Sequence, residues 1–266
     1  MLLAPAGPLA RLEVVDRTGS TNDDVLAGLR EDHDAWPTGS VLLADHQTDG
    51  HGRAGRTWVS TPRTSLTGTF VVRTSGDGQG PGGLGWLPLV VGLGVVRALR
   101  AHEVAAWLKW PNDVLVVVPG AAVLDGWADL RKVAGILVQA TPDRSAVAVG
   151  VGLNVTQQAA ELPVPTATSL ALVGGPTDRE ALLVTVATEL AQVLGRWCAA
   201  DANLPDEVCG MCTTLGRRVQ ATLPGGATLV GQALRLADDA CLVIADETTE
   251  HRIHAGDVVH TVQPPA

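Results

Sequence analysis

Two lysines carry the most distinctive charged chemistry in this sequence. Lys and Arg together number 19, and only Lys109 and Lys132 are lysines. A lysine ends in a compact ammonium group, whereas arginine presents a wide planar fork. Since arginine supplies nearly every other basic position, the two retained lysines indicate a narrow pocket in which a point charge binds a single oxygen. Chance is the alternative interpretation of the count alone, and the surrounding motifs must decide.

A glycine-rich loop supplies the second cationic group. Residues 47–58 read Gln-Thr-Asp-Gly-His-Gly-Arg-Ala-Gly-Arg-Thr-Trp, and their core matches the pattern G-x-G-x-x-G. A dinucleotide site requires a helix that begins at these glycines. Here β-branched residues and a proline follow, so we predict no helix and no NAD site. A loop that wraps an anionic ligand with backbone amides and with Arg53 and Arg56 is one reading, and a plain surface loop is the other.

Composition limits the class of protein. The chain has 266 residues, 46% of them hydrophobic and 3% aromatic, so Leu, Val and Ala must fill the core of one large domain or of a large and a small one. A net charge of −9 argues against a nucleic-acid partner. The first residues lack a basic region typical of a signal peptide, and the longest apolar stretch, 87–96, is half a membrane span. A cytoplasmic protein without a membrane partner is expected.

Strands and helices alternate irregularly, which predicts an α+β fold with a mixed sheet. Strands are expected at residues 11–16, 40–45, 66–73, 107–110, 113–118, 132–139 and 146–152. Helices are expected from Ser20 or Thr21 to about residue 30, at 87–101, and at 177–199 with a Thr177/Glu180 capping box. Residues 75–85, rich in glycine, are expected to form a loop.

The last quarter of the chain changes character. Short strands are expected at residues 217–223, 227–236, 241–245 and 249–254, with a Pro-Gly-Gly turn at 224–226. We therefore predict a catalytic domain over residues 1–212 and a small β-barrel-like domain over 213–266. Cys209 and Cys212 form a lone C-x-x-C, which is expected to be apolar filling near a helix end rather than a metal or redox site.

Taken in order, six segments resemble the biotin protein ligase family. They are Ser20-Thr21-Asn22, residues 47–58, Lys109-Trp-Pro-Asn-Asp-Val, Lys132-Val-Ala-Gly-Ile-Leu, Gly150-Val-Gly-Leu-Asn-Val and Ala167-Thr-Ser-Leu. Together they span roughly residues 12–170. The resemblance implies a class II synthetase-like catalytic domain followed by an SH3-like β-barrel. Because the pattern begins near the first residue, the resemblance is to the monofunctional type, which has no N-terminal DNA-binding domain.

The resemblance also implies the reaction. Such enzymes activate biotin with MgATP to biotinyl-5′-AMP and transfer the biotin to a lysine of a biotin carboxyl carrier domain. It implies Lys132, Arg53, Lys109 and Asp113 as catalytic residues. The biotin-binding residues implied are Ser20, Thr21, Asn22, Gln47, Gly50, His51, Gly52, Arg53, Trp58, Lys132 and Gly135. The ATP- or adenylate-binding residues implied are Arg53, Arg56, Lys109, Trp110, Asn112, Asp113, Lys132 and Asn154. No metal site is expected to be fixed by the protein; Mg²⁺ would arrive with ATP, and Asp113 could contact it.

Each assignment has a structural alternative. Ser20 and Thr21 could only cap a helix, Asn154 could only close a turn, and Trp58 and Trp110 could be packing residues. Two departures from the family pattern stand out. His51 replaces the usual arginine, and residues 119–130 form an insert with Trp127 inside, which could be a longer hairpin or a flap that contacts the carrier. Lipoate or octanoate ligation, and a non-catalytic biotin-sensing regulator, are the alternative functions.

Overall fold

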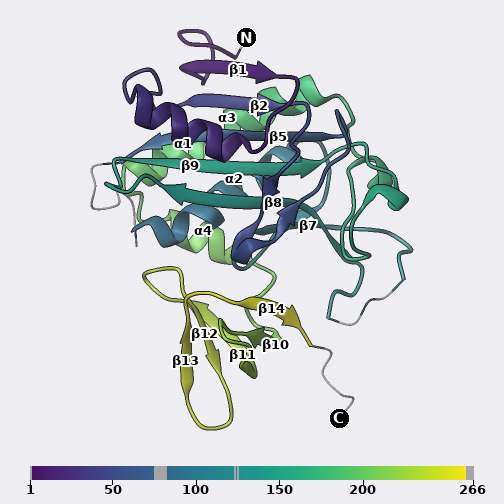
Figure 1. Cartoon of the computed structure of the whole chain (residues 1–266). Coiled ribbons are helices and arrows are strands. Elements are labelled where there is room, and N and C mark those ends of the chain that lie inside the picture. Colours follow the sequence, from purple (N-terminus) through teal and green to yellow (C-terminus); the bar gives the residue numbers. More distant parts are fainter. Residues whose placement is uncertain (1, 75–82, 123, 125, 262–266) are drawn as a thin grey trace.

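The computed structural model describes residues 2–74, 83–122, 124 and 126–261, so most of the expected 75–85 loop lies outside the described residues. Two separate sheets organise the chain, a large one with helices on both faces and a small C-terminal one (Figure 1). This is the α+β architecture that the sequence predicted.

The large sheet is mixed. Its strands in spatial order are β1 (Arg11–Val15), β2 (Ser40–Ala44), β5 (Ser65–Arg73), β9 (Ala146–Asn154), β8 (Leu130–Ala140), β7 (Asp113–Val117) and β6 (Ala106–Lys109). β1 and β2 run parallel. The remaining neighbours are antiparallel. All seven strands were expected, although β8 begins two residues earlier and β9 ends two residues later than predicted.

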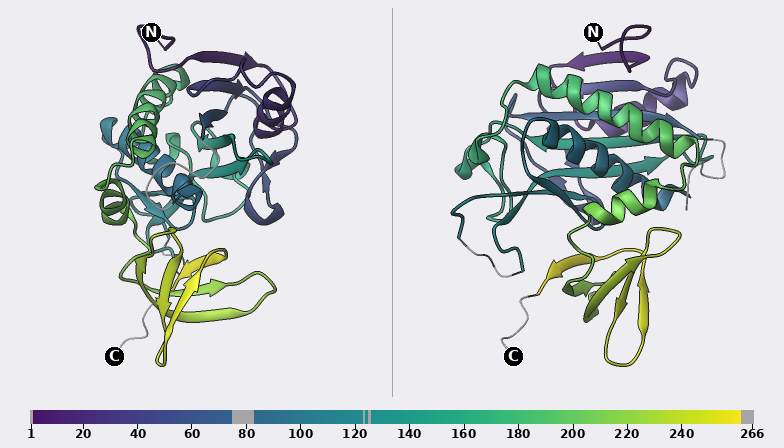
Figure 2. Two further views of the ribbon diagram at one scale, coloured as in Figure 1. Left: turned by 90° about the vertical axis from the view of Figure 1, so that its left-hand side faces the viewer. Right: turned by 180° about the vertical axis from the view of Figure 1, so that it is seen from behind.

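Helices cover both faces of this sheet. α2 (Leu87–Ala101), α3 (Arg179–Cys198) and α4 (Leu204–Met211) lie on one face, and α1 (Thr21–Glu31) lies on the other (Figure 2). Side chains of β5 alternate between the two faces accordingly: Phe70 and Val72 join the core beneath α2 and α3, whereas Val71 joins the smaller core beneath α1. On the side of the large sheet where α1 lies, this single α-helix covers only part of the sheet. A site can therefore lie on the rest of that face.

Most residues of the central helix α2 are apolar and buried, and its two charged residues, Arg97 and Arg100, lie toward its C-terminal end. An added Cβ at Gly92 would lie 2.7 Å from Leu108 Cδ2, and one at Gly94 would lie 2.7 Å from Leu190 Cδ2, so both glycines permit close packing. By length and composition residues 83–101 could cross a membrane, with a mean hydropathy of 1.5, but 67% of that stretch is buried inside the protein. The core helix of a soluble protein has the same properties.

The start of α3 corrects one prediction. Asp178, rather than Thr177, caps the helix, and its carboxylate accepts hydrogen bonds from the backbone N–H groups of Glu180 at 2.9 Å and Ala181 at 3.1 Å. A carboxylate also interacts favourably with the positive end of the helix dipole, which a threonine hydroxyl cannot match.

The small sheet is antiparallel. Its strands are β10 (Arg218–Thr222), β11 (Thr228–Leu236), β12 (Leu242–Ala245), β13 (Glu250–Ile253) and β14 (Asp257–His260), in the spatial order β13-β12-β11-β10-β14. The first four strands were predicted, and β14 was not. Short elements complete the chain: β3 (Gly50–His51), β4 (Thr57–Trp58), and 3₁₀ turns η1 (Arg53–Gly55), η2 (Gly83–Trp86), η3 (Ala159–Glu161) and η4 (Ala171–Val173).

Two tryptophans join the small sheet to the large part. The indole N–H of Trp86 donates to Asp238 O at 2.7 Å, and that of Trp110 donates to Ala240 O at 3.0 Å. The backbone N–H of Thr213 donates to Leu108 O at 2.8 Å, so the segment between the two sheets is itself paired with β6. The division at residues 212 and 213 remains a prediction.

Candidate active site

A cavity of about 540 Å³ lies on the α1 side of the large sheet. Three glycines of its floor let lining side chains pack closely against the sheet: Gly135 on β8, and Gly150 and Gly152 on β9. Gly150, Gly152 and Asn154 alternate along β9, so all three point to the same face. The ring of Trp58 occupies the space above Gly152, where an added Cβ would lie 2.5 Å from Trp58 Cε2.

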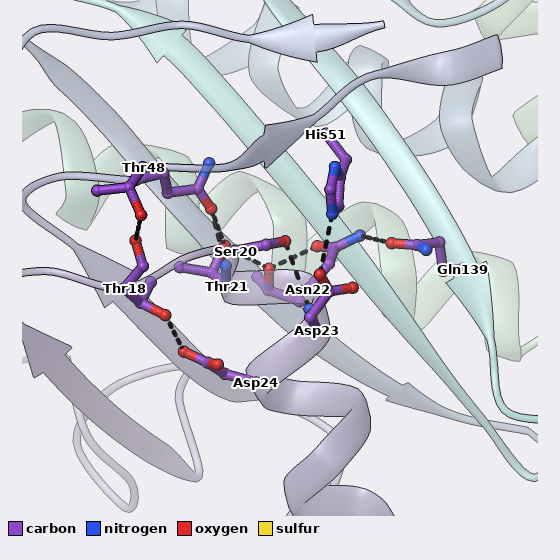
Figure 3. A network of polar contacts seen from close by, with 11 residues as sticks. Thr18, Ser20, Thr21, Asn22, Asp23, Asp24, Thr48, His51 and Gln139 are labelled. Atoms are coloured by element: carbon purple, nitrogen blue, oxygen red, sulfur yellow. Dashed lines mark hydrogen bonds and ion pairs between the residues drawn. The ribbon is translucent and has the colours of Figure 1, made fainter. Parts of the chain in front are cut away.

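Uncharged polar side chains form one end of the cavity. Gln47 Oε1 accepts from the backbone N–H of Thr21 at 2.8 Å and from its hydroxyl at 2.9 Å. Thr69 donates to Asn22 Oδ1 at 2.6 Å, and Asn22 Nδ2 donates to Gln139 Oε1 at 2.7 Å (Figure 3). These contacts fix the orientation of the almost fully buried side chains of Thr21, Asn22 and Gln47. They thus pre-organise a neutral hydrogen-bonding surface.

Two buried polar atoms next to this surface have no hydrogen-bond partner within the described residues. They are Trp58 Nε1 and Thr67 Oγ1, and both residues line the cavity. Buried polar groups are normally paired. Ser20, in contrast, accepts from the backbone N–H of Asp23 at 3.4 Å and caps α1, the structural alternative that the sequence left open.

Cations gather around one carboxylate in the middle of the cavity. Lys132 Nζ lies 2.6 Å from Asp113 Oδ1, and Lys109 Nζ lies 3.9 Å from Asp113 Oδ2. Burial lowers the pKa of Lys109, and the charge of Asp113 opposes that shift. Burial, followed by the charge of Arg56, lowers the pKa of Arg53. The chain thus concentrates positive charge where an anionic ligand could neutralise it.

An irregularity in strand pairing brings Lys132 to this position. Asp113 pairs with Gly135 and Val114 pairs with Ala134, but the next residue, Leu115, pairs with Lys132. Val133 is therefore an extra residue, a β-bulge of the kind that re-aims a neighbouring side chain.

The glycine loop folds as a tight hairpin and not as a helix start. Gly50 pairs with Trp58 and His51 with Thr57, and the only helical geometry between them is the 3₁₀ turn η1. The prediction that no α-helix begins at these glycines is confirmed. Arg53 and Arg56 line the cavity, and Arg56 also forms an ion pair with Asp257 on β14.

His51, the departure from the family pattern, faces α1. Its Nε2 lies 2.9 Å from Asp23 Oδ2, near the N-terminus of α1, although the residue still lines the cavity beside Gly52. Gly50 lies behind the lining, where an added Cβ would come within 2.6 Å of Trp58 O and 2.7 Å of Gln47 Nε2. Its role is to let the hairpin close over Gln47.

Trp110 corrects one assignment. Its side chain is 2% exposed and is absent from the cavity lining, because its ring packs in the core and its N–H binds Ala240 O. We therefore assign it a packing role instead of a nucleotide contact. Asn112 and Asn154 do line the cavity, but each donates its amide to a backbone carbonyl: Asn112 to Ile136 O at 2.7 Å, Asn154 to Thr168 O at 2.9 Å.

Asp113 does not fit a magnesium site. Each of its carboxylate oxygens faces an ammonium group, so a divalent cation there would meet two like charges. Among the described residues, the only cluster with metal-ligand chemistry is Asp239, Cys241 and His254, and none of the three lines the cavity.

Sequence reasoning missed one wall of the cavity. Trp127 from the insert, and Asp257, Val258 and Val259 from β14, also line the cavity. The insert was visible in the sequence as an anomaly, but no motif connected it with residues 130 positions later.

Comparison with known proteins identifies the family. A sequence model of the Biotin/lipoate A/B protein ligase family matches residues 14–155. The chain belongs to that family. It is 37% identical over 260 residues to biotin--[acetyl-CoA-carboxylase] ligase of Mycobacterium tuberculosis, covering 94% of this chain and 89% of that relative. It is also 37% identical over 147 residues to the enzyme of the same name from Paracoccus denitrificans, covering 52% of each chain.

A solved structure supports the family fold. Biotin protein ligase from Aquifex aeolicus, in complex with biotin and ATP, aligns with a TM-score of 0.72 at 27% identity, covering 94% of this chain and 98% of that one. The coverage includes both sheets. The resemblance to biotin protein ligases drawn from the ordered motifs is thereby confirmed.

Proposed function

We propose that this protein is a biotin–protein ligase, which converts biotin and MgATP to biotinyl-5′-AMP and pyrophosphate and then transfers biotin to a lysine of a carboxyl carrier domain. One observation carries the proposal: a single cavity has a neutral polar end at Thr21, Asn22 and Gln47 and a cationic centre at Lys109 and Lys132. The relatives named above are called biotin ligases. Such chemistry belongs in the cytoplasm, where ATP and the carrier protein are found.

The neutral end suits the ureido group of biotin. That group is uncharged and both donates and accepts hydrogen bonds, as do the amide and hydroxyl groups of Thr21, Asn22 and Gln47. The unpaired N–H of Trp58 and hydroxyl of Thr67 offer two further partners at this end. The apolar ring system of biotin would then lie beside the Trp58 ring, which itself packs on Gly152.

Adenylation would take place around Lys132. An oxygen of the biotin carboxylate attacks the α-phosphorus of ATP, a new O–P bond forms, and the bond to pyrophosphate breaks. Negative charge builds on the phosphoryl oxygens in this step, and the Lys132 ammonium, oriented by Asp113, would stabilise it. Arg53, Arg56 and Lys109 would bind the remaining phosphate charge.

Transfer would follow on the same surface. The neutral amine of the carrier lysine attacks the acyl carbon, the C–O bond to AMP breaks, and the nitrogen loses a proton as the amide forms. Arg53 and Arg56 on the hairpin could cover the mixed anhydride and exclude the water that would hydrolyse it. Magnesium would enter with ATP, bound by the phosphates, because Asp113 is already paired with both lysines.

The neutral end favours biotin over lipoate and octanoate. The dithiolane ring of lipoate and the alkyl chain of octanoate carry no hydrogen-bonding groups, so Trp58 Nε1 and Thr67 Oγ1, which have no partner within the described residues, would gain none from these ligands.

Pyrophosphate exchange into ATP tests the proposal. We expect exchange with biotin and at most trace exchange with lipoate or octanoate at equal concentration. Exchange with lipoate alone would replace the proposal with a lipoate ligase. Tight biotin binding without any exchange would indicate the regulator.

A further inference from the structure

The insert between β7 and β8 is a structured loop with its own internal anchor. Leu124 and Ala128 form a β-bridge, and the side chain of Arg131, only 5% exposed, donates to the carbonyls of Ala122, Ala128 and Leu130. Three carbonyl contacts to one buried guanidinium hold the loop together at its base. Since β7 and β8 are antiparallel neighbours, the insert lengthens the hairpin between them, which is one of the two forms that the sequence suggested. A flap that contacts the carrier, the other form, stays a prediction.

This loop rests on the small sheet. Gly126 has a φ of +73°, and an added Cβ there would lie 2.0 Å from His260 O and 2.6 Å from Val259 Cγ1. Only glycine allows so close an approach in that conformation. The backbone of the insert is thus seated on β14, next to the residue whose side chain enters the cavity.

That residue is Trp127. Lys109 Nζ lies 5.1 Å from the centre of its ring. The side chain of Lys109 is 7% exposed and that of Lys132 is 29% exposed, so Lys109 is the more deeply buried. Lys109 Nζ is nevertheless farther from the carboxylate of Asp113, at 3.9 Å, than Lys132 Nζ is, at 2.6 Å. Its other charged neighbours are Lys132 and Arg56, which repel it, and Asp257, which attracts it.

The charges around Lys109 therefore do not balance it. A buried ammonium normally needs a close partner. The face of an aromatic ring attracts a cation, and tryptophan does so best. Two tryptophans line the cavity within the described residues, and each lies beside one lysine: Trp58 near Lys132 at 5.7 Å and Trp127 near Lys109.

We propose that Trp127 is a positioning residue for Lys109, which it holds toward the phosphates of ATP through a cation–π contact, and that the insert carries it there by resting on β14. The proposal deepens the proposed function and rests on it. Without the ring, Lys109 would share one carboxylate with a nearer lysine and would turn away from the nucleotide.

Substitution of Trp127 by Leu or Phe tests this inference in the full chain by biotin-dependent pyrophosphate exchange. Trp127→Leu removes the ring and keeps an apolar side chain, and we expect the KM for ATP to rise about tenfold while the KM for biotin stays within about twofold. Trp127→Phe keeps a ring and should retain most of the ATP affinity. Equal KM values for ATP in both variants and the wild type would overturn the inference, as would equal rises for ATP and biotin.

A double substitution separates positioning from simple packing. In a Lys109→Met background, where no ammonium remains, Trp127→Leu should change the KM for ATP no further. A full additional tenfold rise there would show that Trp127 acts independently of Lys109 and would refute the proposal.

Gly126→Ala provides a variant that keeps Trp127 intact. The added methyl group would push the insert off β14, so we expect the same selective rise in the KM for ATP; an unchanged KM would show that seating on β14 is not required.

If the wild-type protein shows no exchange with biotin, the proposed function fails. If it exchanges normally and the variants do too, only the positioning role of Trp127 fails.

Discussion

The two lysines of the cavity share Asp113, yet their surroundings are built in different ways. Lys132 is held mainly by two neighbouring strands of the large sheet: β8 carries it beside the bulge at Val133, and β7 supplies the carboxylate. Trp58, from the nearby glycine-loop hairpin, lies beside it. Lys109 ends β6, and its aromatic partner comes from an insert supported by the C-terminal sheet. The Lys132 end is local to the large sheet, whereas the Lys109 end depends on packing between distant parts of the chain.

The largest expected effect is at the Lys132 end. We predict that Lys132→Arg lowers kcat/KM for biotin adenylation about a hundredfold or more, because the wider guanidinium cannot present the same point charge to the phosphoryl oxygens. Space is limited there, since an added Cβ at Gly135 would already lie 3.1 Å from Lys132 Nζ. Pyrophosphate exchange measures the effect.

Arg100→Lys is the matched control for this change. Arg100 donates to Ala106 O at 3.0 Å and lies outside the cavity lining, so activity should be retained. Full activity of Lys132→Arg would contradict the assignment of Lys132 to the reaction.

The next effect concerns the floor beneath Trp58. Gly152→Ala would place a methyl group 2.5 Å from Trp58 Cε2 and displace the ring. Overpacking of this kind costs about 1–3 kcal/mol, so we expect the KM for biotin to rise about tenfold or more with little change for ATP.

Gly195→Ala in α3 is the control for a glycine without such a contact. An added Cβ there meets nothing within 4 Å, and the variant should gain up to about 1 kcal/mol of stability. A Gly152→Ala enzyme with unchanged biotin kinetics would show that the Trp58 face is not part of the biotin site.

Acid should destabilise the β14 side through His260. Burial, with the charges of Lys109 and Arg217, lowers the pKa of His260 to about 3, against about 6.5 in the unfolded chain. Between those values the unfolded chain binds a proton that the folded chain does not, so stability falls as the pH drops below 6.5. At pH 5 the loss from this group is at most about 2 kcal/mol.

Urea denaturation at pH 7.5 and pH 5 measures this contribution. His260→Gln should lose less stability over that interval than the wild type, whereas His254→Gln, whose side chain is 66% exposed, should behave like the wild type. Parallel losses in all three proteins would exclude His260 as the source.

The smallest expected effect concerns the ion pair that joins the glycine loop to β14. Arg56 and Asp257 are 59% and 55% exposed, and pairs this exposed contribute at most about 1 kcal/mol. Asp257→Asn should therefore raise the KM for ATP by about fivefold or less, and high salt should remove the difference. Glu250→Gln, which breaks the exposed Arg235 pair on the same sheet, is the control. A rise in the KM for ATP above tenfold would mean that the contact between the glycine loop and β14 depends on this ion pair.

Local sequence patterns predicted most elements and most lining residues. The seven strands of the large sheet follow from short runs of apolar and β-branched residues. Gln47, Asn112 and Lys132 lie in the ordered family motifs and line the cavity. The strand β14 escaped prediction because four residues, Asp-Val-Val-His, carry too little periodicity. Trp127 and Asp257 escaped because only folding brings them beside Lys109.

Trp110 shows the limit of motif reasoning. It lies between Lys109 and Asn112, two residues that line the cavity, but its side chain points into the core beneath Ala240. Neighbours in a motif share a segment without sharing a direction, because successive side chains of an extended chain point to opposite sides.

By itself, the sequence determined which chemical groups are available, their order and the strands that carry them, since these depend on residue type and local periodicity. The tertiary structure decided which groups meet. Lys132 and Gly135 are three residues apart and would face opposite sides of a regular strand, yet both line the cavity because Val133 is bulged out of register. The sharing of Asp113 between two lysines, and the seating of Trp127 against Lys109, likewise arise only when separate strands and the C-terminal sheet pack together.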